Sequence, residues 1–209
     1  MLTQEEWMGA LNARHGKERQ EKFSRAVVAV CGLGGLGSNV AIALARAGIG
    51  KLILIDFDRV DVTNLNRQQY KASQLGMNKT EALAQNLREI NPFIRLETHA
   101  VRISEENAQE LLQEADVVCE AFDVPEAKAM LVNFVLENMP EKYLVAGSGM
   151  AGFGSPNTIQ TRRITGRFYL CGDTVSDVND GIGLVCARVM VCAAHEAHTI
   201  LRLLANEME

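Results

Sequence analysis

A run of glycines is the first feature of this chain that points to chemistry. Residues 32–37 read GLGGLG, with the spacing G-x-G-x-x-G, between a β-branched run and a segment rich in Ala and Leu. In this spacing Gly32 permits a tight turn, Gly34 lets a phosphate approach the backbone, and Gly37 lets a helix pack closely on the preceding strand. A purely structural turn is the alternative. The strand–loop–helix context favours a nucleotide, whose phosphates would face the first amides of the helix.

Two carboxylates follow the next apolar run. Asp56 and Asp58 come directly after the run KLILI, in the sequence DFD. An acidic residue roughly 20 residues after such a glycine loop commonly binds the ribose hydroxyls of a nucleotide. Because the same fingerprint occurs in NAD-binding proteins, an NAD-dependent oxidoreductase is one hypothesis.

A cluster of polar residues then argues for a different use of the nucleotide. The segment TNLNRQQY contains Asn64, Arg67 and Gln68, and GMNK places Lys79 at the start of a predicted helix. The planar guanidinium of arginine suits phosphate oxygens. A lysine at a helix start opposes the helix dipole, so a polyphosphate nearby explains it better than helix stability does. A dehydrogenase needs no such cluster, whereas nucleotidyl transfer does.

Asp123 completes the set of charged residues. It follows the apolar run ADVVC and precedes a predicted helix over Pro125–Glu137. It either caps that helix or binds a magnesium ion that bridges phosphates. An anion cradle, cations and a carboxylate are the equipment for attack of a substrate carboxylate on the α-phosphate of ATP. Catalysis would then rest on positioning and charge stabilisation.

The elements that must position these residues alternate regularly from residue 26 to about residue 147. Short apolar runs predict strands, and segments of helical period predict helices. This alternation is typical of a Rossmann-like, doubly wound, mostly parallel α/β sheet, in which the carboxyl ends of the strands meet at the ligand-binding edge. The expected strands are Ala26–Cys31, Lys51–Asp56, Ile94–Ala100, Ala115–Cys119 and Tyr143–Gly147, and the expected helices are Ser38–Ala47, Lys79–Ile90, Glu105–Gln113 and Pro125–Glu137.

The pattern changes at both ends of the chain. After residue 147 we expect a small antiparallel region and then a long helix over Gly181–Leu204. The glycine-rich segment Gly147–Gly154 could form a channel for a chain that lacks side chains, or a flexible connection. We divide the chain into an N-terminal helical arm, residues 1–24, and a single ATP-binding domain, residues 25–209.

Composition limits the class of protein. The 209 residues are 47% hydrophobic and 22% charged, with a net charge of −5, so a large nucleic-acid surface is not expected. No segment has the length of a membrane span or the apolar core of a signal peptide, which predicts a cytoplasmic protein. The five cysteines form no CxxC pair and are expected to be buried free thiols, with no zinc site.

Four sequence blocks together resemble a known family. GLGGLGS, DFDRVDVTNLNRQ, GMNK and CEAFD stand in the order and spacing of the ThiF/MoeB/HesA family, over about residues 14–204. The family is related to the adenylation domain of ubiquitin-activating enzymes, and this chain looks like its compact second ThiF branch, associated with thiamine biosynthesis. The resemblance implies a homodimer that uses ATP and magnesium to adenylate the C-terminal Gly-Gly of a ubiquitin-like sulfur carrier such as ThiS.

The resemblance also assigns residues by motif position. It implies that Gly34, Gly35 and Gly37 line the phosphates, that Asp58 holds the ribose with support from Asp56, that Asn64, Arg67 and Lys79 bind the triphosphate beside Gln68, and that Asp123 binds magnesium. The family also lends an arginine of its N-terminal helix to the partner subunit's site. Arg14 is the candidate here, although Arg19 is close by and a surface arginine without a role is the alternative.

The chain departs from longer relatives in its cysteines. Those relatives bind zinc with two CxxC pairs, and some carry a cysteine in the loop before the last helix that serves sulfur transfer. Here Cys171 has no partner in such a pair, the loop GDTVSDVNDGIG has no cysteine, and Cys186 is expected to pack in the core. Two further alternatives remain open: a threonylcarbamoyl-adenosine tRNA dehydratase, which shares the NxNRQ block, and an adapter that binds a carrier without turnover.

Overall fold

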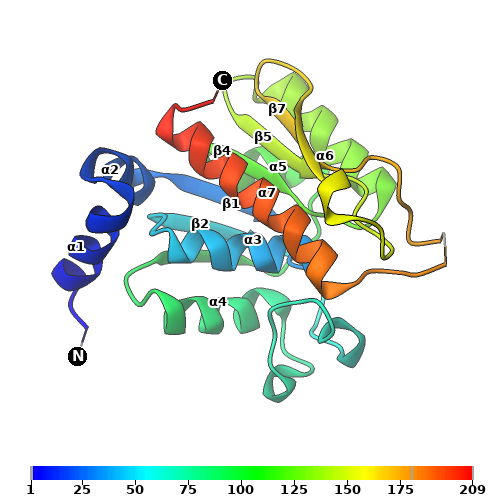
Figure 1. Cartoon of the computed structure of the whole chain (residues 1–209), viewed down its shortest axis with the longest axis horizontal. Coiled ribbons are helices and arrows are strands. Elements are labelled where there is room, and N and C mark those ends of the chain that lie inside the picture. Colours follow the sequence, from blue (N-terminus) through cyan, green and yellow to red (C-terminus); the bar gives the residue numbers. More distant parts are fainter. Residues whose placement is uncertain (1, 180, 209) are drawn as a thin grey trace.

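The structure is a computed structural model that describes residues 2–179 and 181–208. In this part of the chain seven strands form one sheet, in the order β3-β2-β1-β4-β5-β7-β6 (Figure 1). Neighbouring strands pair in parallel except β6 and β7, which pair antiparallel. The predicted mostly parallel sheet with a small antiparallel region is confirmed. The strands are β1 Val27–Cys31, β2 Lys51–Ile55, β3 Arg95–His99, β4 Val117–Glu120, β5 Tyr143–Gly147, β6 Gln160–Arg163 and β7 Phe168–Gly172.

Helices cover both faces of the sheet (Figure 1). α3, α4 and α7 pack on one face, and α5 and α6 pack on the other. The helices are α1 Gln4–His15, α2 Lys17–Arg25, α3 Gly35–Arg46, α4 Lys79–Ile90, α5 Glu105–Leu112, α6 Pro125–Asn138 and α7 Cys186–Ala205, with 3-10 turns at Val62–Asn64, Ala72–Gln74 and Pro156–Thr158.

Strand β1 shows why the central strands are continuous apolar runs. Val28 and Val30 point into the core beneath α3, α4 and α7, while Ala29 and Cys31 point into the core beneath α5 and α6. Side chains of a strand alternate between the two faces, and here both faces are covered. A strand in this position therefore needs apolar residues at every position rather than at every second one.

The terminal helix begins later than the sequence predicts. The expected range was Gly181–Leu204, whereas α7 starts at Cys186 and its N-cap, Val185, is extended. Gly181 has a φ of 114°, which no helix accepts, and glycine favours helix poorly. The prediction that Cys186 packs in the core is wrong. It is half-buried in the first turn of α7, where its Sγ lies 3.7 Å from Met190 Sδ.

Two helices precede the sheet and lie at the amino ends of its strands. Thr3 caps α1 by accepting from Glu6 N, and α2 leads through Ala26 directly into β1. The division into an arm over residues 1–24 and a domain over residues 25–209 stays a prediction, and residues 1, 180 and 209 lie outside the described part. Across residues 2–179 and 181–208, every helix is too short or too polar to cross a bilayer.

Candidate active site

A cavity of about 320 Å³ opens at the carboxyl ends of the strands. It has two sides. The first, here called the glycine-loop wall, comprises Gly32, Gly34, Gly35, Leu36, Asp56, Phe57, Asp58, Arg67, Gln68 and Lys79. The second, here called the crossover wall, comprises Gly147, Ser148, Gly149, Met150, Ala151, Ser176, Asp177 and Val178. Asp123 and Lys128 also line the cavity, and they follow β4, which lies between β1 and β5.

The glycine loop is shaped by two contacts that exclude side chains. A Cβ at Gly37 would lie 1.8 Å from Gly32 O, and a Cβ at Gly32 would lie 2.7 Å from Ala121 O. Gly32 also has a φ of 89°, in the left-handed region. Helix α3 starts inside the loop at Gly35, three residues earlier than predicted, and no side chain caps it. Its first amides therefore remain available to an anion at the cavity wall.

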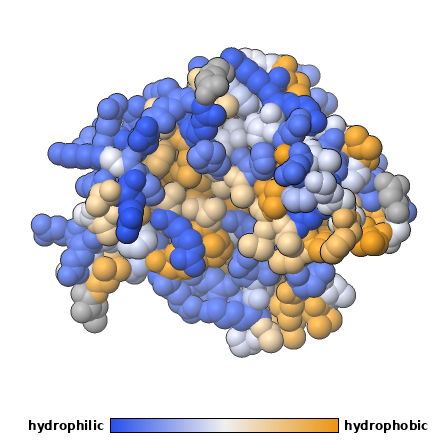
Figure 2. Space-filling view, viewed as in Figure 1, coloured by the Kyte–Doolittle hydropathy of each residue, from blue (hydrophilic) through white to orange (hydrophobic). Residues whose placement is uncertain are grey.

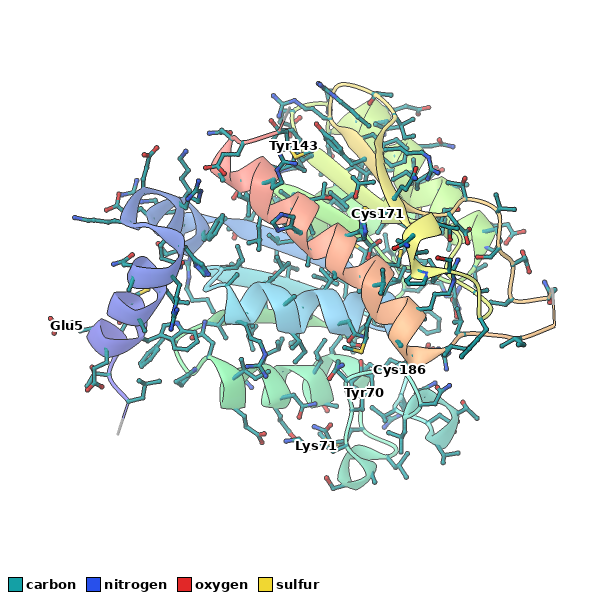
Figure 3. All side chains as sticks on the ribbon, in the orientation of Figure 1. Glu5, Tyr70, Lys71, Tyr143, Cys171 and Cys186 are labelled. Atoms are coloured by element: carbon teal, nitrogen blue, oxygen red, sulfur yellow. The ribbon has the colours of Figure 1, made fainter. Side chains whose placement is uncertain are left out.

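Asp56 stabilises this loop by hydrogen bonds to the backbone. Its Oδ2 accepts from Leu33 N at 2.7 Å and its Oδ1 accepts from Asp58 N at 2.8 Å, so the buried carboxylate joins the loop to the end of β2. Tyr70 adds a second brace, because its hydroxyl donates to Leu33 O at 2.7 Å. Burial, together with the charges of Asp56 and Asp58, raises the pKa of Tyr70, which keeps the hydroxyl neutral and able to donate. Figure 3 labels Tyr70 at the end of the molecule where α7 begins.

Asp58 is the exposed member of the acidic pair. About half of its side chain is accessible, and its Oδ2 pairs with Lys79 Nζ at 2.9 Å. Lys79 is almost fully buried at the start of α4, with its amide held by Asp58 O at 2.9 Å. The carboxylate of Asp56 is thus occupied by backbone amides, whereas that of Asp58 faces the cavity beside the Lys79 ammonium group.

The polar loop after β2 brings two unsatisfied groups to the cavity. Arg67 donates through Nη1 to Thr63 O at 3.0 Å and to Asn66 Oδ1 at 2.8 Å, but its buried Nε has no partner among the described residues. Gln68 Oε1 is likewise buried and lacks a partner in residues 2–179 and 181–208. Buried polar groups are nearly always hydrogen-bonded. Both residues also line the cavity, where their polar groups are close to any bound ligand.

Asp123 is exposed at the mouth of the cavity. Helix α6 has Val124 as its N-cap and no side-chain cap, so the alternative that Asp123 caps this helix is wrong. No hydrogen bond or ion pair joins its carboxylate to the described residues. A free carboxylate beside a phosphate cradle fits a magnesium ion, which proteins usually hold with one or two carboxylates and the phosphates themselves. The assignment of magnesium to Asp123 stays a prediction.

The cavity also contains residues that the sequence analysis did not single out. Lys128 donates from Nζ to Glu120 Oε2 at 2.5 Å and to Gly147 O at 2.9 Å. Burial raises the pKa of Glu120, while Lys128 opposes that rise. The hint in the sequence is Glu120 directly after the apolar residues 117–119, because a carboxylate that becomes buried there is stabilised by a cation nearby.

A model of the ThiF family matches residues 9–208. The chain belongs to the ThiF family. Relatives include an adenylyltransferase and sulfurtransferase of Lodderomyces elongisporus, 34% identical over 203 residues, and a sulfur carrier protein adenylyltransferase of Thermus thermophilus, 38% identical over 131 residues. These matches cover 92% and 62% of this chain but 43% of each relative. The matched part of this ThiF-family chain therefore covers less than half the length of each of these relatives.

Solved structures give a second comparison. The E. coli tRNA N6-threonylcarbamoyladenosine dehydratase in complex with ATP has a TM-score of 0.87 and 25% identity, over 99% of this chain and 98% of that chain. E. coli MccB with ATP has a TM-score of 0.70 and 25% identity, over 92% of this chain and 59% of that chain. The ThiF-family fold is thus matched over its full length by a structure of similar size.

Three of the predicted site residues of this ThiF-family chain lie outside the cavity lining. Gly37 packs on Gly32, and Asn64 closes its own 3-10 turn by accepting from Asp61 N at 2.9 Å. Arg14 is exposed on α1. That helix, on which Figure 3 labels Glu5, lies at the opposite end of the molecule. Its role at a partner's site stays a prediction. The nearby Arg19 pairs with Glu207 at 2.6 Å.

The cysteines are dispersed through the two cores. Cys31, Cys119, Cys171 and Cys192 are buried and Cys186 is half-buried, all as free thiols. Burial raises the pKa of the Cys171 thiol to about 12, so this thiol stays protonated and unreactive. Within the described residues, no three His, Cys, Asp or Glu side chains gather as metal ligands would. That the chain binds no zinc stays a prediction, which metal analysis of the purified protein would test.

Proposed function

We propose that this chain transfers AMP from ATP to the C-terminal Gly-Gly carboxylate of a ubiquitin-like sulfur carrier such as ThiS, in thiamine or related sulfur-transfer biosynthesis. Membership of the ThiF family supports this, as do relatives named adenylyltransferases and, in one case, a sulfur carrier protein adenylyltransferase. The observation that carries the proposal is the cavity itself. It joins an anion cradle, flanked by Arg67, Gln68 and Lys79, on one side to a glycine-containing wall on the other.

In this proposal ATP lies along the glycine-loop wall. Complexes of the E. coli dehydratase with ATP and AMP support a nucleotide in such a fold. The amides of Gly34 and Gly35 face the phosphates, Arg67 and Lys79 supply cations, and Asp58 accepts hydrogen bonds from the ribose. Lys79 already forms an ion pair with Asp58. Binding of a triphosphate would therefore draw the Lys79 ammonium group from the carboxylate toward the phosphate oxygens.

The reaction follows from this arrangement. An oxygen of the carrier's carboxylate attacks the α-phosphorus and forms a new P–O bond, while the bond to the β-phosphate oxygen breaks and pyrophosphate leaves. Arg67 and Lys79 stabilise the charge that builds on the phosphate oxygens. Magnesium, when bound, offsets the charge of the departing pyrophosphate, and Asp123 is the carboxylate that fits it. No side chain of the protein needs to act as nucleophile.

The crossover wall would receive the tail of the carrier. Gly149 has a φ of 77°, and a Cβ there would lie 2.2 Å from Asp173 Oδ1. A side chain at either Gly147 or Gly149 would thus clash with packed neighbours, and as glycines both contribute only backbone to this wall. An extended Gly-Gly tail needs little width, so this wall suits it and would exclude a tail with bulky terminal residues.

We also propose that the chain works as a homodimer in which Arg14 reaches the partner subunit's site. Mixing inactive Arg14→Ala and Asp123→Ala chains should then restore part of the exchange activity, because one hybrid site keeps both groups. Mass photometry must show that the subunits exchange. If mixed and exchanged chains stay inactive, Arg14 acts in its own subunit or not at all.

A tRNA dehydratase is the second candidate. The match in fold to the E. coli tRNA N6-threonylcarbamoyladenosine dehydratase, over 99% and 98% of the two chains, favours it. The net charge of −5 disfavours it, because binding of tRNA phosphates needs a basic surface. The two candidates share the adenylation step and differ in the carboxylate that is activated.

ATP–pyrophosphate exchange separates them. The chain should exchange label with a ThiS-like carrier, and not with the same carrier after removal of its terminal Gly-Gly. Exchange that requires instead tRNA bearing threonylcarbamoyl-adenosine would replace this proposal with the second candidate. A chain that binds the carrier but exchanges no label would be an adapter.

A further inference from the structure

Lys128 is a cation that lines the cavity, and the proposed binding of ATP assigns it no role. A quarter of its side chain is exposed, and it lines the cavity. Its ammonium group donates to Glu120 Oε2 and to Gly147 O. An ammonium group has three N–H donors. One donor is therefore left for a ligand.

Glu120 holds this ammonium group in place. The carboxylate is fully buried on β4, where its Oε1 accepts from Phe122 N at 2.7 Å and its Oε2 accepts from Lys128. A buried carboxylate that is fixed by the backbone cannot follow a moving lysine. The ion pair thus fixes the Lys128 ammonium group at the carboxyl end of β4.

The place where it is fixed lies between the two walls. Strand β4 pairs with β1, which leads into the glycine loop, and with β5, which ends at Gly147. The walls meet here, since a Cβ at Gly147 would lie 2.5 Å from Leu36 Cδ1 in the first turn of α3. In an adenylation, the attacking carboxylate and the α-phosphate must meet at such a junction.

Charge favours the carboxylate as the ligand of Lys128. Arg67 and Lys79 stand on the glycine-loop wall, where they can serve the phosphates. The residues of the crossover wall include no lysine or arginine. A carboxylate that approaches a triphosphate from that side meets strong repulsion, and a nearby cation lowers it.

We propose that Lys128 binds the terminal carboxylate of the carrier and holds it against the α-phosphate, with Gly147 O and Glu120 fixing the ammonium group. This inference rests on the proposed function, of which it names one further binding residue. The carboxylate takes the third N–H of the ammonium group. Because the contact is made with the carrier and not with ATP, its loss should weaken binding of the carrier alone.

The test compares Lys128→Met with Lys142→Met. Lys142 is a matched control, because its Nζ also donates to two acceptors, here the backbone carbonyls of Gln113 at 2.8 Å and Ala115 at 2.7 Å, and it lies outside the cavity lining. Calorimetry would measure binding of a ThiS-like carrier with a C-terminal carboxylate and of the same carrier with a C-terminal amide, each with a non-hydrolysable ATP analogue. Thermal melts would show that both variants are folded.

The wild type and Lys142→Met should bind the carboxylate form at least about tenfold more tightly than the amide form, as expected for a charge-assisted hydrogen bond. In Lys128→Met the ratio should fall to about one, with ATP affinity within about twofold of the wild type. A ratio that persists in Lys128→Met overturns the inference, and so does an equal loss of ATP affinity, which would make Lys128 a phosphate ligand. A wild type that exchanges no pyrophosphate with any Gly-Gly carrier overturns the proposed function itself.

Discussion

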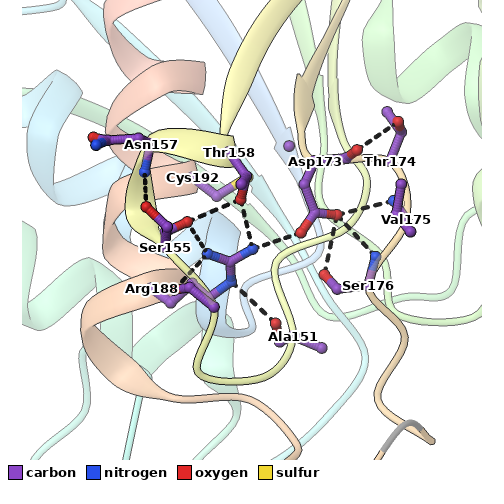
Figure 4. Close-up of polar contacts among 12 residues, drawn as sticks. Ala151, Ser155, Asn157, Thr158, Asp173, Thr174, Val175, Ser176, Arg188 and Cys192 are labelled. Atoms are coloured by element: carbon purple, nitrogen blue, oxygen red, sulfur yellow. Dashed lines mark hydrogen bonds and ion pairs between the residues drawn. The ribbon is translucent and has the colours of Figure 1, made fainter.

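The two walls of the cavity are held in place by different kinds of side chain. On the glycine-loop wall, short segments hold each other: Asp56 bonds to Leu33 N and Asp58 N, and Asp58 pairs with Lys79. The crossover wall is held by backbone bonds, such as that from Asp173 N to Gly149 O at 2.9 Å, and by one arginine of the terminal helix. Arg188, from α7, donates to Ala151 O at 3.0 Å, Gly154 O at 3.0 Å, Ser155 O at 2.7 Å, Thr158 Oγ1 at 3.1 Å and Asp173 Oδ2 at 2.5 Å (Figure 4).

Asp173 extends this arrangement to the second loop. Its Oδ1 accepts from Val175 N at 2.9 Å and from Ser176 N at 2.8 Å, so the Arg188–Asp173 pair ties residues 151–158 to residues 173–176. Burial would raise the pKa of Asp173, but the bonds from Ser176, Val175 and Arg188 outweigh burial and lower it. The glycine-loop wall is thus held by the carboxylates of Asp56 and Asp58 at the end of β2, and the two loops of the crossover wall are joined by Arg188 and its ion pair with Asp173.

The surface reflects the same division. Figure 2 shows apolar residues gathered at the right-hand end of the molecule, beyond the start of α7. Exposed apolar side chains of the loop before α7 include Val175, Val178 and Ile182, which are 84%, 52% and 58% accessible. The loop before α7 therefore exposes apolar side chains next to the crossover wall, and one of them, Val178, also lines the cavity.

The largest expected effect on activity comes from Asp123, which lies between the two walls. Asp123→Ala should lower the rate of ATP–pyrophosphate exchange about a thousandfold, because several kcal/mol of charge stabilisation are lost with the metal ligand. Its fold should be intact, since no described residue bonds to the carboxylate. Circular dichroism would serve as the control. Normal exchange by the folded variant would remove Asp123 from the site.

Arg188→Ala should break the crossover wall. Removing one partner of a buried ion pair costs about 3–5 kcal/mol of unfolding free energy. The KM for the carrier should rise while the affinity for ATP stays the same, since the glycine-loop wall is held independently. Arg162→Ala is the control, because Arg162 donates to Gly172 O at 2.8 Å but forms no hydrogen bond or ion pair with Asp173 or with residues 151–158. Equal losses of ATP and carrier binding would mean that the walls are not independent.

Arg67→Ala and Lys79→Ala should give the reverse pattern. Each should weaken ATP binding by about 1.5–3 kcal/mol, the value of a hydrogen bond to a charged group, and leave binding of the carrier unchanged. Arg59→Ala and Lys71→Ala are matched controls from the same region whose side chains lie outside the cavity. Normal ATP affinity in both Arg67→Ala and Lys79→Ala would contradict the phosphate role.

The smallest effect concerns Glu196, which lies under the junction of the walls. It is fully buried, its carboxyl oxygens have no partner among residues 2–179 and 181–208, and burial raises its pKa, which Glu120 raises further and Lys128 lowers. The folded chain then binds more protons than the unfolded chain above the unfolded carboxyl pKa of about 4.3, so stability falls as the pH rises. Glu196→Gln should remove up to about 1.4 kcal/mol of this loss per pH unit. Chemical denaturation at several pH values would measure the slope, and parallel slopes in the two proteins would contradict the assignment.

The sequence by itself determined the alternation of strands and helices and the composition of the glycine-loop wall. Helix α4 and strand β5 have the predicted bounds, and Asp56, Asp58, Arg67 and Lys79 follow closely upon one another along the chain. These features depend on local period and on short connections, which a sequence displays directly.

Only the tertiary structure decided the rest. It placed β7 in parallel beside β5, turned Asn64 onto its own loop, and brought Lys128 to Gly147 and Arg188 to Ala151. The last two contacts join residues 19 and 37 positions apart, across the edge of the sheet. Lysine and arginine are long, flexible side chains that could point to solvent. Their partners are chosen by which loops the packed helices bring within reach, and no local pattern records that choice.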